Sequence, residues 1–428
     1  MDLSVMFFGA DAPAGGTDAP AGGAEASANG AGTGAGRGRH VGAYDDILAI
    51  ARAADRLGFH AVWTPERHFQ QVGQVFPSPP VLSAALAVAT ERIGIRAGSV
   101  VLPLHHPLRV VEDWAVVDNL SRGRVGLSVA TGWHSADFVV SPGAYADRRE
   151  RMLRDVPLLR RLWAGEAVEF EDGAGEAVAV RPTPAPVQDA LPLWLTTSGS
   201  PETWETAGRL RAGVLGATVG QSRDELAGKI ARYRAAFATA HAAAAAAAPE
   251  QDGTGPGGTE QEWARQSRSP HGGSPHDEVR HGGSPHNEVR HGGSPHNGAP
   301  HRGFGARGRV TLMAHTFVGE DDAHVRRLVA EPLTAYLRSY VRQTSANRSA
   351  DRRTAGLTDE QTALMAEFAF RRYLTWGSLL GSAETCRTML ADLRELGVDE
   401  VACFIDFGLG RDEVLAGLHR LAELQEEL

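Results

Sequence analysis

Short apolar runs alternate with amphipathic stretches along most of the chain. The runs carry β-branched and aromatic residues and end in turn signals, which is typical of buried strands. The stretches between them repeat apolar positions with the period of a helix, as at Ile47, Ala51 and Ala54. Eight strands are predicted, at residues 3–8, 61–63, 93–102, 125–130, 193–197, 214–217, 310–317 and 400–404. Helices are predicted at residues 45–57, 79–90, 107–120, 147–163, 201–210, 224–237, 321–340, 383–396 and 412–424.

Strands that alternate with helices favour a parallel sheet with right-handed crossovers. Eight such units predict an α/β fold, a (β/α)8 TIM barrel, with an open doubly wound sheet as the alternative. The turn Gly9-Ala10-Asp11 after the first strand does not follow the G-x-G-x-x-G pattern of dinucleotide-binding sheets, which favours the barrel. In a barrel the candidate site residues are those just after each strand.

Two segments interrupt the pattern. Residues 11–40 are nearly all small or polar, and residues 241–308 hold an alanine tract and the repeats HGGSPHDEVR and HGGSPHNEVR. Neither segment has enough apolar residues to form a core, so both are predicted to be disordered insertions in a single domain spanning 1–428. The first follows strand one and the second precedes strand seven. The repeated histidines could bind zinc or nickel loosely, but expansion of a solvent-exposed loop is the favoured interpretation.

Composition excludes some classes of function. The formal net charge is −9, and nucleic-acid binding needs a basic face, so we expect no nucleic-acid partner. No apolar run reaches the roughly 18 residues of a membrane helix, and the apolar N-terminus lacks the basic leader of a signal peptide. The two cysteines, Cys386 and Cys403, favour a reducing compartment, so we expect a cytoplasmic protein. Lys229 is the only lysine, which we interpret as biased codon usage.

Titratable residues follow the second and third predicted strands. Glu66 and His68 stand two residues apart, which puts them on one side of an extended chain. Glu66 could orient the imidazole, and His68 could act as an acid or base near neutral pH. A surface ion pair with Arg67 is the alternative. His105-His106 is not accompanied by a matched set of carboxylates, so we predict no metal site, and His106 is interpreted as a helix-start residue.

Small residues at two other strands could admit a flat ligand. Gly98 and Ser99 lie in the third predicted strand, where small side chains let a ring approach the backbone. Thr131-Gly132-Trp133 follows the fourth strand, and Trp133 is a candidate for stacking on a ligand or for plugging the rim.

The turn after the fifth predicted strand suits a phosphate. Thr197, Ser198, Gly199 and Ser200 precede Pro201 at a helix start, where backbone N–H groups and the helix dipole favour an anion. Ordinary N-capping by Ser198 or Ser200 is the alternative.

Several of these runs, in order along the chain, resemble the bacterial luciferase-like flavin monooxygenases. The most specific are residues 101–114 (VLPLHHPLRVVEDW) and 118–124 (DNLSRGR), and residues 58–63, 66–69, 197–200 with Trp204, and 381–386 also match. Within that family the chain is most similar to the branch associated with natural-product biosynthesis.

The resemblance implies a TIM barrel that binds reduced FMN from a separate flavin reductase and uses O2 to oxygenate an organic substrate, free or bound to a carrier protein. It implies a phosphate grip at residues 197–200. The isoalloxazine bed falls at Gly98 and Ser99, where the family can carry a non-prolyl cis peptide. Trp133, Phe7 and Phe69 would enclose the ring. His68 with Glu66 would manage protons.

Bacterial luciferase departs from this chain at the site. It has two adjacent histidines where this chain has Arg67-His68, and an arginine and a reactive cysteine where this chain has Thr131 and Ala130. We therefore do not expect light emission from a long-chain aldehyde. Arg67 or Arg109 could supply the cation instead.

Two other functions are alternatives. A deazaflavin could support hydride transfer on the same fold, or the chain could be a non-catalytic flavin-binding subunit. Residues 341–376 are predicted to form a lid, whose arginines could receive an acidic carrier protein, although a solvated helix face is the favoured interpretation. The resemblance also implies a homodimer formed through barrel helices.

Overall fold

A computed structural model of the chain describes residues 1–9, 39–69, 74–197, 199–247, 304–350 and 357–427. The chain divides into two compact units, Met1–Ala242 with Pro300–Leu428, and Ala243–Ala299. The first unit carries all the strands named below. Of the second, only the end of one helix, up to Ala247, is described.

Eight parallel strands close into a barrel. Neighbours pair in the order β11, β1, β2, β3, β4, β7, β8 and β9, and β9 pairs with β11 to complete the circle. This confirms the predicted (β/α)8 fold and all eight predicted strands. The alternative prediction of an open doubly wound sheet is wrong. The strands are β1 (Asp2–Met6), β2 (Ala61–Thr64), β3 (Gly94–Val101), β4 (Val125–Ala130), β7 (Leu193–Thr196), β8 (Gly213–Ala217), β9 (Val310–Gly319) and β11 (Glu400–Phe404).

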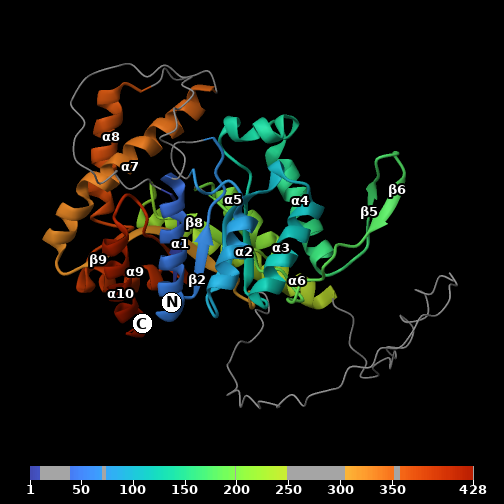
Figure 1. Cartoon of the computed structure of the whole chain (residues 1–428), viewed down its shortest axis with the longest axis horizontal. Coiled ribbons are helices and arrows are strands. Elements are labelled where there is room, and N and C mark those ends of the chain that lie inside the picture. Colours follow the sequence, from blue (N-terminus) through green and yellow to red (C-terminus); the bar gives the residue numbers. More distant parts are fainter. Residues whose placement is uncertain (10–38, 70–73, 198, 248–303, 351–356, 428) are drawn as a thin grey trace, which may run out of the picture. The chain divides into compact units, whose positions relative to one another are not determined.

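Helices cover the outside of the barrel, and α1 to α4 follow one another around it (Figure 1). The main hydrophobic core lies between the strands and these helices. Among the described residues no helix is long and apolar enough to cross a membrane. The helices are α1 (Arg39–Arg56), α2 (Pro79–Ala89), α3 (Pro107–Ser121), α4 (Arg148–Trp163), α5 (Pro201–Arg209), α6 (Arg223–Ala247), α7 (Asp322–Ala350), α8 (Asp359–Tyr373), α9 (Ala383–Glu395) and α10 (Arg411–Glu426).

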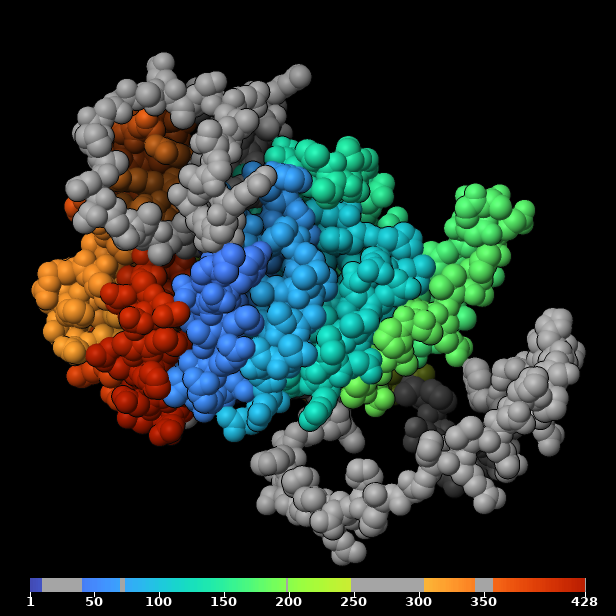
Figure 2. Space-filling view, in the orientation of Figure 1, coloured from blue at the N-terminus to red at the C-terminus, as the bar shows by residue number. Residues whose placement is uncertain are grey.

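Three strands and one helix were not predicted from the sequence. A mostly exposed antiparallel hairpin, β5 (Val168–Glu171) and β6 (Ala177–Val180), stands out from the helices in Figure 2. The short strand β10 (Leu379–Ser382) pairs with the carboxyl half of β9. Helix α8 packs on α7, and these two helices contain most of the described part of the predicted lid at 341–376.

The predicted insertions are wrong at their boundaries. Helix α1 already begins at Arg39, and α6 continues through the alanine tract to Ala247, because alanine has the highest helix propensity of all residues. The ring of Phe304 packs on Trp194, with 4.6 Å between the ring centroids. Residues 11–38 and 248–303, including the histidine repeats, lie outside the described residues.

Two tryptophans fill the interior of the barrel. Trp63 and Trp194 meet edge to face, with their ring centroids 5.1 Å apart. Glycines on neighbouring strands make room for them, because a Cβ at Gly98 would lie 3.0 Å from Trp63 Cε3 and one at Gly213 would lie 2.5 Å from Trp194 Cδ1. The guanidinium of Arg96 lies over both rings, 4.9 and 4.7 Å from their centroids.

Glu400 accepts hydrogen bonds from four other strands or their ends. Its Oε1 accepts from Ser4 Oγ at 2.5 Å, Trp63 Nε1 at 3.1 Å and Arg96 Nη1 at 2.7 Å. Its Oε2 accepts from Arg309 Nε at 2.9 Å, just before β9. Burial alone would raise the pKa of this carboxyl, but Arg96 and Arg309 hold that pKa well below its usual value. The carboxylate therefore joins β1, β2, β3, β9 and β11 at their amino ends.

Replacing Glu400 with alanine should destabilise the fold strongly. The change leaves Arg96 without its buried counter-charge and Arg309 with only Asp2, and such a loss typically costs about 3–5 kcal/mol. Urea unfolding followed by tryptophan fluorescence measures the loss. Glu427→Ala is the control, because it removes an exposed partner of Arg387 and should cost less than about 1 kcal/mol. Equal midpoints for the two variants would show that Glu400 is not a structural centre.

A second buried titratable group lies near the other end of the barrel. His315 on β9 is enclosed by rings of Tyr336, Tyr373, Phe404 and Phe407. Burial lowers its pKa from 6.5 to about 3. The folded state therefore holds a neutral imidazole at pH values where the unfolded chain already binds a proton.

Acid should destabilise the protein through His315. Because the folded pKa lies below the unfolded one, the contribution is fully present above pH 6.5 and is lost as pH falls toward 3. For one group the loss is about 1.4 kcal/mol per pH unit. His315→Phe should reduce the fall in unfolding free energy between about pH 7 and pH 5. The exposed His419→Phe is the control, and an unchanged slope in His315→Phe would contradict the assignment.

Candidate active site

The Glu66 carboxylate is the centre of a buried polar cluster at the carboxyl ends of β2 and β3. Its Oε1 accepts hydrogen bonds from His68 Nε2 at 2.9 Å and His105 Nε2 at 2.7 Å. Its Oε2 accepts from the backbone N–H of Val101 at 2.7 Å. Burial alone would raise the pKa of Glu66, but the bonds from His105 and His68 outweigh it, and the pKa is lowered. The carboxylate is therefore ionised and holds both imidazoles.

The two histidines of the His105-His106 pair have different roles. Burial tends to lower the pKa of His105, but its hydrogen bond to Glu66 and that charge raise it overall. His106 Nδ1 accepts from the N–H of Leu108 at 3.3 Å and caps α3, which confirms the helix-start interpretation for this residue. The contact between His105 and Glu66 was not predicted, because the two residues are distant in the chain.

Arg67 is buried without an ion-pair partner among the described residues. Its guanidinium lies over the ring of Phe8 at 3.9 Å, and its Nε has no hydrogen-bond partner. Burial lowers its pKa, and nearby Tyr336 and Asp137 oppose the shift only in part. The alternative of an ion pair between Glu66 and Arg67 is wrong, because Glu66 binds the histidines. A buried cation without a counter-charge destabilises the folded protein unless an anion pairs with it.

Asp406 follows β11 on the same side of the barrel. Its carboxylate accepts from the N–H groups of Phe8 and Gly9, both at 2.7 Å. Burial raises the pKa of Asp406 to about 6, against these bonds and the charge of Arg67. The bonds fix the chain as it leaves β1.

The bed predicted at Gly98 and Ser99 has the backbone that the resemblance implies. The peptide between them is cis, and the register of β3 against β4 shifts there. The hydroxyl of Ser99 bonds to that of Thr196, which also lies 2.6 Å from Ser128 Oγ. Three hydroxyls from β3, β4 and β7 thus meet below the mouth of the barrel.

The aromatic residues predicted to enclose a ring take different positions. Trp133 is 39% exposed, and its ring lies 6.3 Å from that of Tyr340 on α7. Phe7 is 1% exposed and packs on Phe76 between the strands and helices, so its predicted role is wrong. The next residue, Phe8, is the one that faces the interior, because side chains alternate along a strand.

Three other predicted residues lie at the mouth of the barrel or on the surface. Thr131 Oγ1 donates to the carbonyl of Gly132 at 3.3 Å. Phe69 is 69% exposed. Arg109 is exposed and pairs with Asp113 of its own helix at 2.7 Å, so it does not join the Glu66 cluster.

The turn before α5 combines a capped helix start with the only lysine of the chain. Ser200 Oγ accepts from the N–H of Thr203 at 3.4 Å, which confirms N-capping by this residue. Thr197 Oγ1 accepts from the N–H of Gly199 at 3.2 Å, and Ser198 lies outside the described residues. Lys229 Nζ lies 3.7 Å from the place that a Cβ on Gly199 would take. Lys229 Nζ also donates to Gln221 Oε1 at 2.6 Å, which holds its charge near this turn.

Helices α7 and α8 lie beside this end of the barrel. The Tyr336 ring of α7 meets Phe8 edge to face, with centroids 5.2 Å apart. Of the arginines proposed to receive a carrier protein, Arg342 pairs with Asp359 at 2.8 Å and Arg371 pairs with Glu367 at 2.6 Å. Both are exposed, as expected of a solvated helix face. Arg352 and Arg353 lie outside the described residues.

Comparison with curated proteins finds monooxygenases. The chain is 30% identical over 155 residues to the oxygenase component of the flavin-dependent trigonelline monooxygenase of Acinetobacter baylyi, covering 36% of this chain and 42% of that protein. It is 30% identical over 189 residues to the 4-hydroxyprotoasukamycin monooxygenase of Streptomyces nodosus subsp. asukaensis, covering 42% and 50%. The chain thus spans half or less of these relatives.

Solved structures share the fold over almost the whole chain. The monooxygenase RslO1 of Streptomyces bottropensis has a TM-score of 0.64 at 20% identity, covering 100% of this chain and 99% of that one. The oxygenating constituent of 3,6-diketocamphane monooxygenase from Pseudomonas putida, in complex with FMN, has 0.59 at 15%, covering 91% and 94%. An F420-dependent secondary alcohol dehydrogenase has 0.56 at 14%, covering 88% and 95%.

The family model described as luciferase-like monooxygenase matches residues 23–251, which is more than half of the chain. The closed barrel and the motif that runs from the end of β3 through α3 agree with that match. The protein therefore belongs to the luciferase-like monooxygenase family.

Proposed function

We propose that this protein is a monooxygenase that holds reduced FMN at the carboxyl ends of its strands and uses O2 to insert one oxygen atom into an organic substrate. The position of Glu66 carries the proposal. Its carboxylate joins His68 and His105 to the N–H of Val101, only two residues after Ser99 in the bulge. Groups that can hold or move a proton are thereby tied to the proposed ring bed.

The residues at this end of the barrel fit a polar, planar group. Native proteins pair most of their buried polar atoms, so unpaired ones mark a ligand or water. Of the described residues, four near the carboxyl ends of β2, β4 and β9 carry such an atom: Thr64 Oγ1, Arg67 Nε, His134 Nε2 and His315 Nδ1. Gly98, Ser99, Thr131 and Trp133 are proposed to bound the ring.

Reduced flavin, when bound, supplies the electrons that activate O2. The protein's own residues would then manage charge, protons and water. His68 is proposed to hold or release a proton at Nε2, with Glu66 keeping its ring in place. The cation of Arg67 would stabilise negative charge that develops nearby. Phe8 and Tyr336 would exclude water from that side.

The phosphate of FMN is proposed to bind at the start of α5. The backbone of Gly199 and Ser200 begins the helix, whose dipole favours an anion. Lys229 adds a positive charge beside Gly199, and Arg149 reaches Thr203 in the first turn at 3.5 Å. These cations offset the carboxylate of Glu202, which Ser200 holds at 2.6 Å in the same turn.

The partners follow from the same proposal. The turn after β1 lacks a dinucleotide fingerprint, and the trigonelline enzyme is named as an oxygenase component, which supports a separate flavin reductase. The Streptomyces relatives support a small substrate from secondary metabolism. The cytoplasmic location, the homodimer and the carrier-bound form of the substrate remain predictions.

Removing the charge of Glu66 should reduce the effect of the protein on the reaction of reduced FMN with O2. Photoreduced FMN is mixed with air in the presence of protein, and the return of oxidised FMN is followed by absorbance. The parent protein should change the rate of FMN oxidation relative to free flavin. In Glu66→Gln this difference in rate should be at least about tenfold smaller, because the two histidines lose their ionised hydrogen-bond acceptor. Glu427→Gln is the exposed control. A parent rate equal to that of free flavin would reject the proposed function.

The sole lysine provides a direct test of the phosphate position. Lys229→Gln should weaken FMN binding about tenfold, the effect of losing one charge-assisted contact, and leave riboflavin binding unchanged. Quenching of flavin fluorescence measures both. In the parent protein FMN, but not riboflavin, should protect Lys229 from an amine-reactive reagent, with the modified peptide identified by mass spectrometry. Equal losses for both flavins would place the phosphate elsewhere.

The likeness to an F420-dependent dehydrogenase supports a second candidate, hydride transfer by a deazaflavin. Titration of the protein with FMN and with F420 separates the two. We expect FMN to bind more tightly, and tighter binding of F420 without O2 consumption would favour the second candidate.

A further inference from the structure

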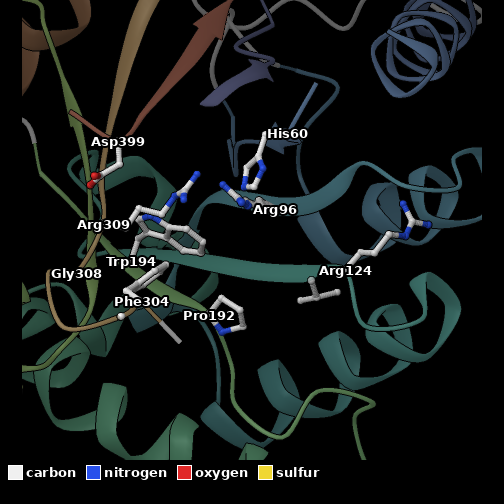
Figure 3. A pocket seen from close by; sticks show the side chains of 11 residues that line it. His60, Arg96, Arg124, Pro192, Trp194, Phe304, Gly308, Arg309 and Asp399 are labelled. Carbon is white, nitrogen blue, oxygen red and sulfur yellow. The ribbon is translucent and has the colours of Figure 1, made fainter. Parts of the chain in front are cut away.

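A cavity of about 230 Å³ opens at the amino ends of the strands, the opposite end of the barrel from the Glu66 cluster (Figure 3). Its lining comes from the start of β3, β4 and β7 and from the turns that lead into β2, β9 and β11. The residues that matter for the argument are His60, Arg96, Trp194, Phe304, Gly305 and Arg309. None of them belongs to the proposed flavin site.

Two arginines, Arg96 and Arg309, form the charged wall of the cavity, and Asp2 also pairs with Arg309. Arg96 and Arg309 share the buried carboxylate of Glu400, which already accepts from Ser4 and Trp63 as well. Arg96 donates only through Nη1 among the bonds of the described residues, so the rest of its guanidinium is left for a ligand.

Among the described residues, no titratable group around the cavity other than Glu400 forms an ion pair with Arg96. Burial lowers the pKa of His60 to about 4, so it is neutral at pH 7. Asp399 lies on the rim, but Arg234 binds it at 2.6 Å. Arg124 also lines the cavity, but it is not free for a ligand, because its guanidinium donates to backbone carbonyls, including that of Ile93.

The wall that adjoins the two arginines is aromatic. The rings of Phe304 and Trp194 meet edge to face with centroids 4.6 Å apart, and in Figure 3 they lie beside Arg96 and Arg309. A guanidinium fork recognises a carboxylate, and an aromatic surface recognises a flat apolar body. The cavity is at the small end of ligand sites, which suits a molecule with a single ring.

We propose that this cavity is a second binding site, separate from the flavin site, for a small aromatic carboxylate. The carboxylate would pair with Arg96 and Arg309, and the ring would lie against Trp194 and Phe304. Because both arginines belong to the network of Glu400, a ligand that binds only the folded protein would also stabilise the barrel.

Calorimetric titration of the full chain with benzoate, without flavin, tests the proposal. We expect saturable binding of benzoate and at least about tenfold weaker binding of benzyl alcohol, which keeps the ring and lacks the charge. Saturable binding of inorganic phosphate with no preference for benzoate would overturn the aromatic part. Absence of any benzoate binding would overturn the site. Neither result bears on FMN, whose binding is measured separately.

Two variants test the location without touching the ion network. Gly305 lines the cavity and a Cβ there meets nothing within 4 Å, so Gly305→Trp should fill the space and remove benzoate binding. Phe304→Ala should weaken it about tenfold. Gly173→Trp, in the exposed β5–β6 turn where a Cβ also meets nothing within 4 Å, is the matched control. Unchanged benzoate affinity in Gly305→Trp, with FMN binding intact, would reject the site.

Discussion

The carboxylate of Glu400 is the contact on which the geometry of the barrel depends. It stands at the first position of β11 and accepts hydrogen bonds from Ser4, Trp63, Arg96 and Arg309. Hydrogen bonds between adjacent strands set the register of neighbours, but this one group joins strands that are not neighbours in the sheet. It can do so because the barrel is closed at this end around Trp63 and Trp194, leaving one buried anion among two cations. A low-dielectric interior makes such a cluster rigid when complete and costly when incomplete.

Two buried arginines show how the same residue type serves opposite ends of the barrel. Arg96 is bound to Glu400 and lies between two indole rings, so it contributes to the structure. Arg67 is equally buried, but among the described residues it has only the ring of Phe8 and more distant charges. A buried cation without a counter-charge lowers the stability of an enzyme. An anionic ligand or a developing negative charge offsets this loss. The difference between the two ends is therefore a difference in which charges are already compensated.

The fold was predictable because its signal is local. Each of the eight barrel strands is a short apolar run flanked by turn residues, and the helices between them have a repeating apolar face. The pair Glu66 and His68 was also predictable, since two residues along an extended chain share a side. His105 and Lys229 were not, because Glu66 and Gly199 are far from them in sequence and only the closed barrel brings them close. The hairpin β5–β6 was missed because it is mostly exposed and lacks a buried face, and the helical alanine tract was missed because it resembles low-complexity sequence.

By itself the sequence determined the class of fold, the order of its elements and the family, because periodicity and the run at 101–124 are properties of neighbouring residues. It also marked Gly98, Ser99 and residues 197–200 as places for a flat anionic cofactor. The tertiary structure decided which side chains meet. It turned Phe8 rather than Phe7 into the interior, left Arg109 on the surface, set Lys229 against the α5 turn, and opened a charged cavity at the far end. These outcomes depend on strand register and barrel closure, which bring distant residues into contact and cannot be read from spacing along the chain.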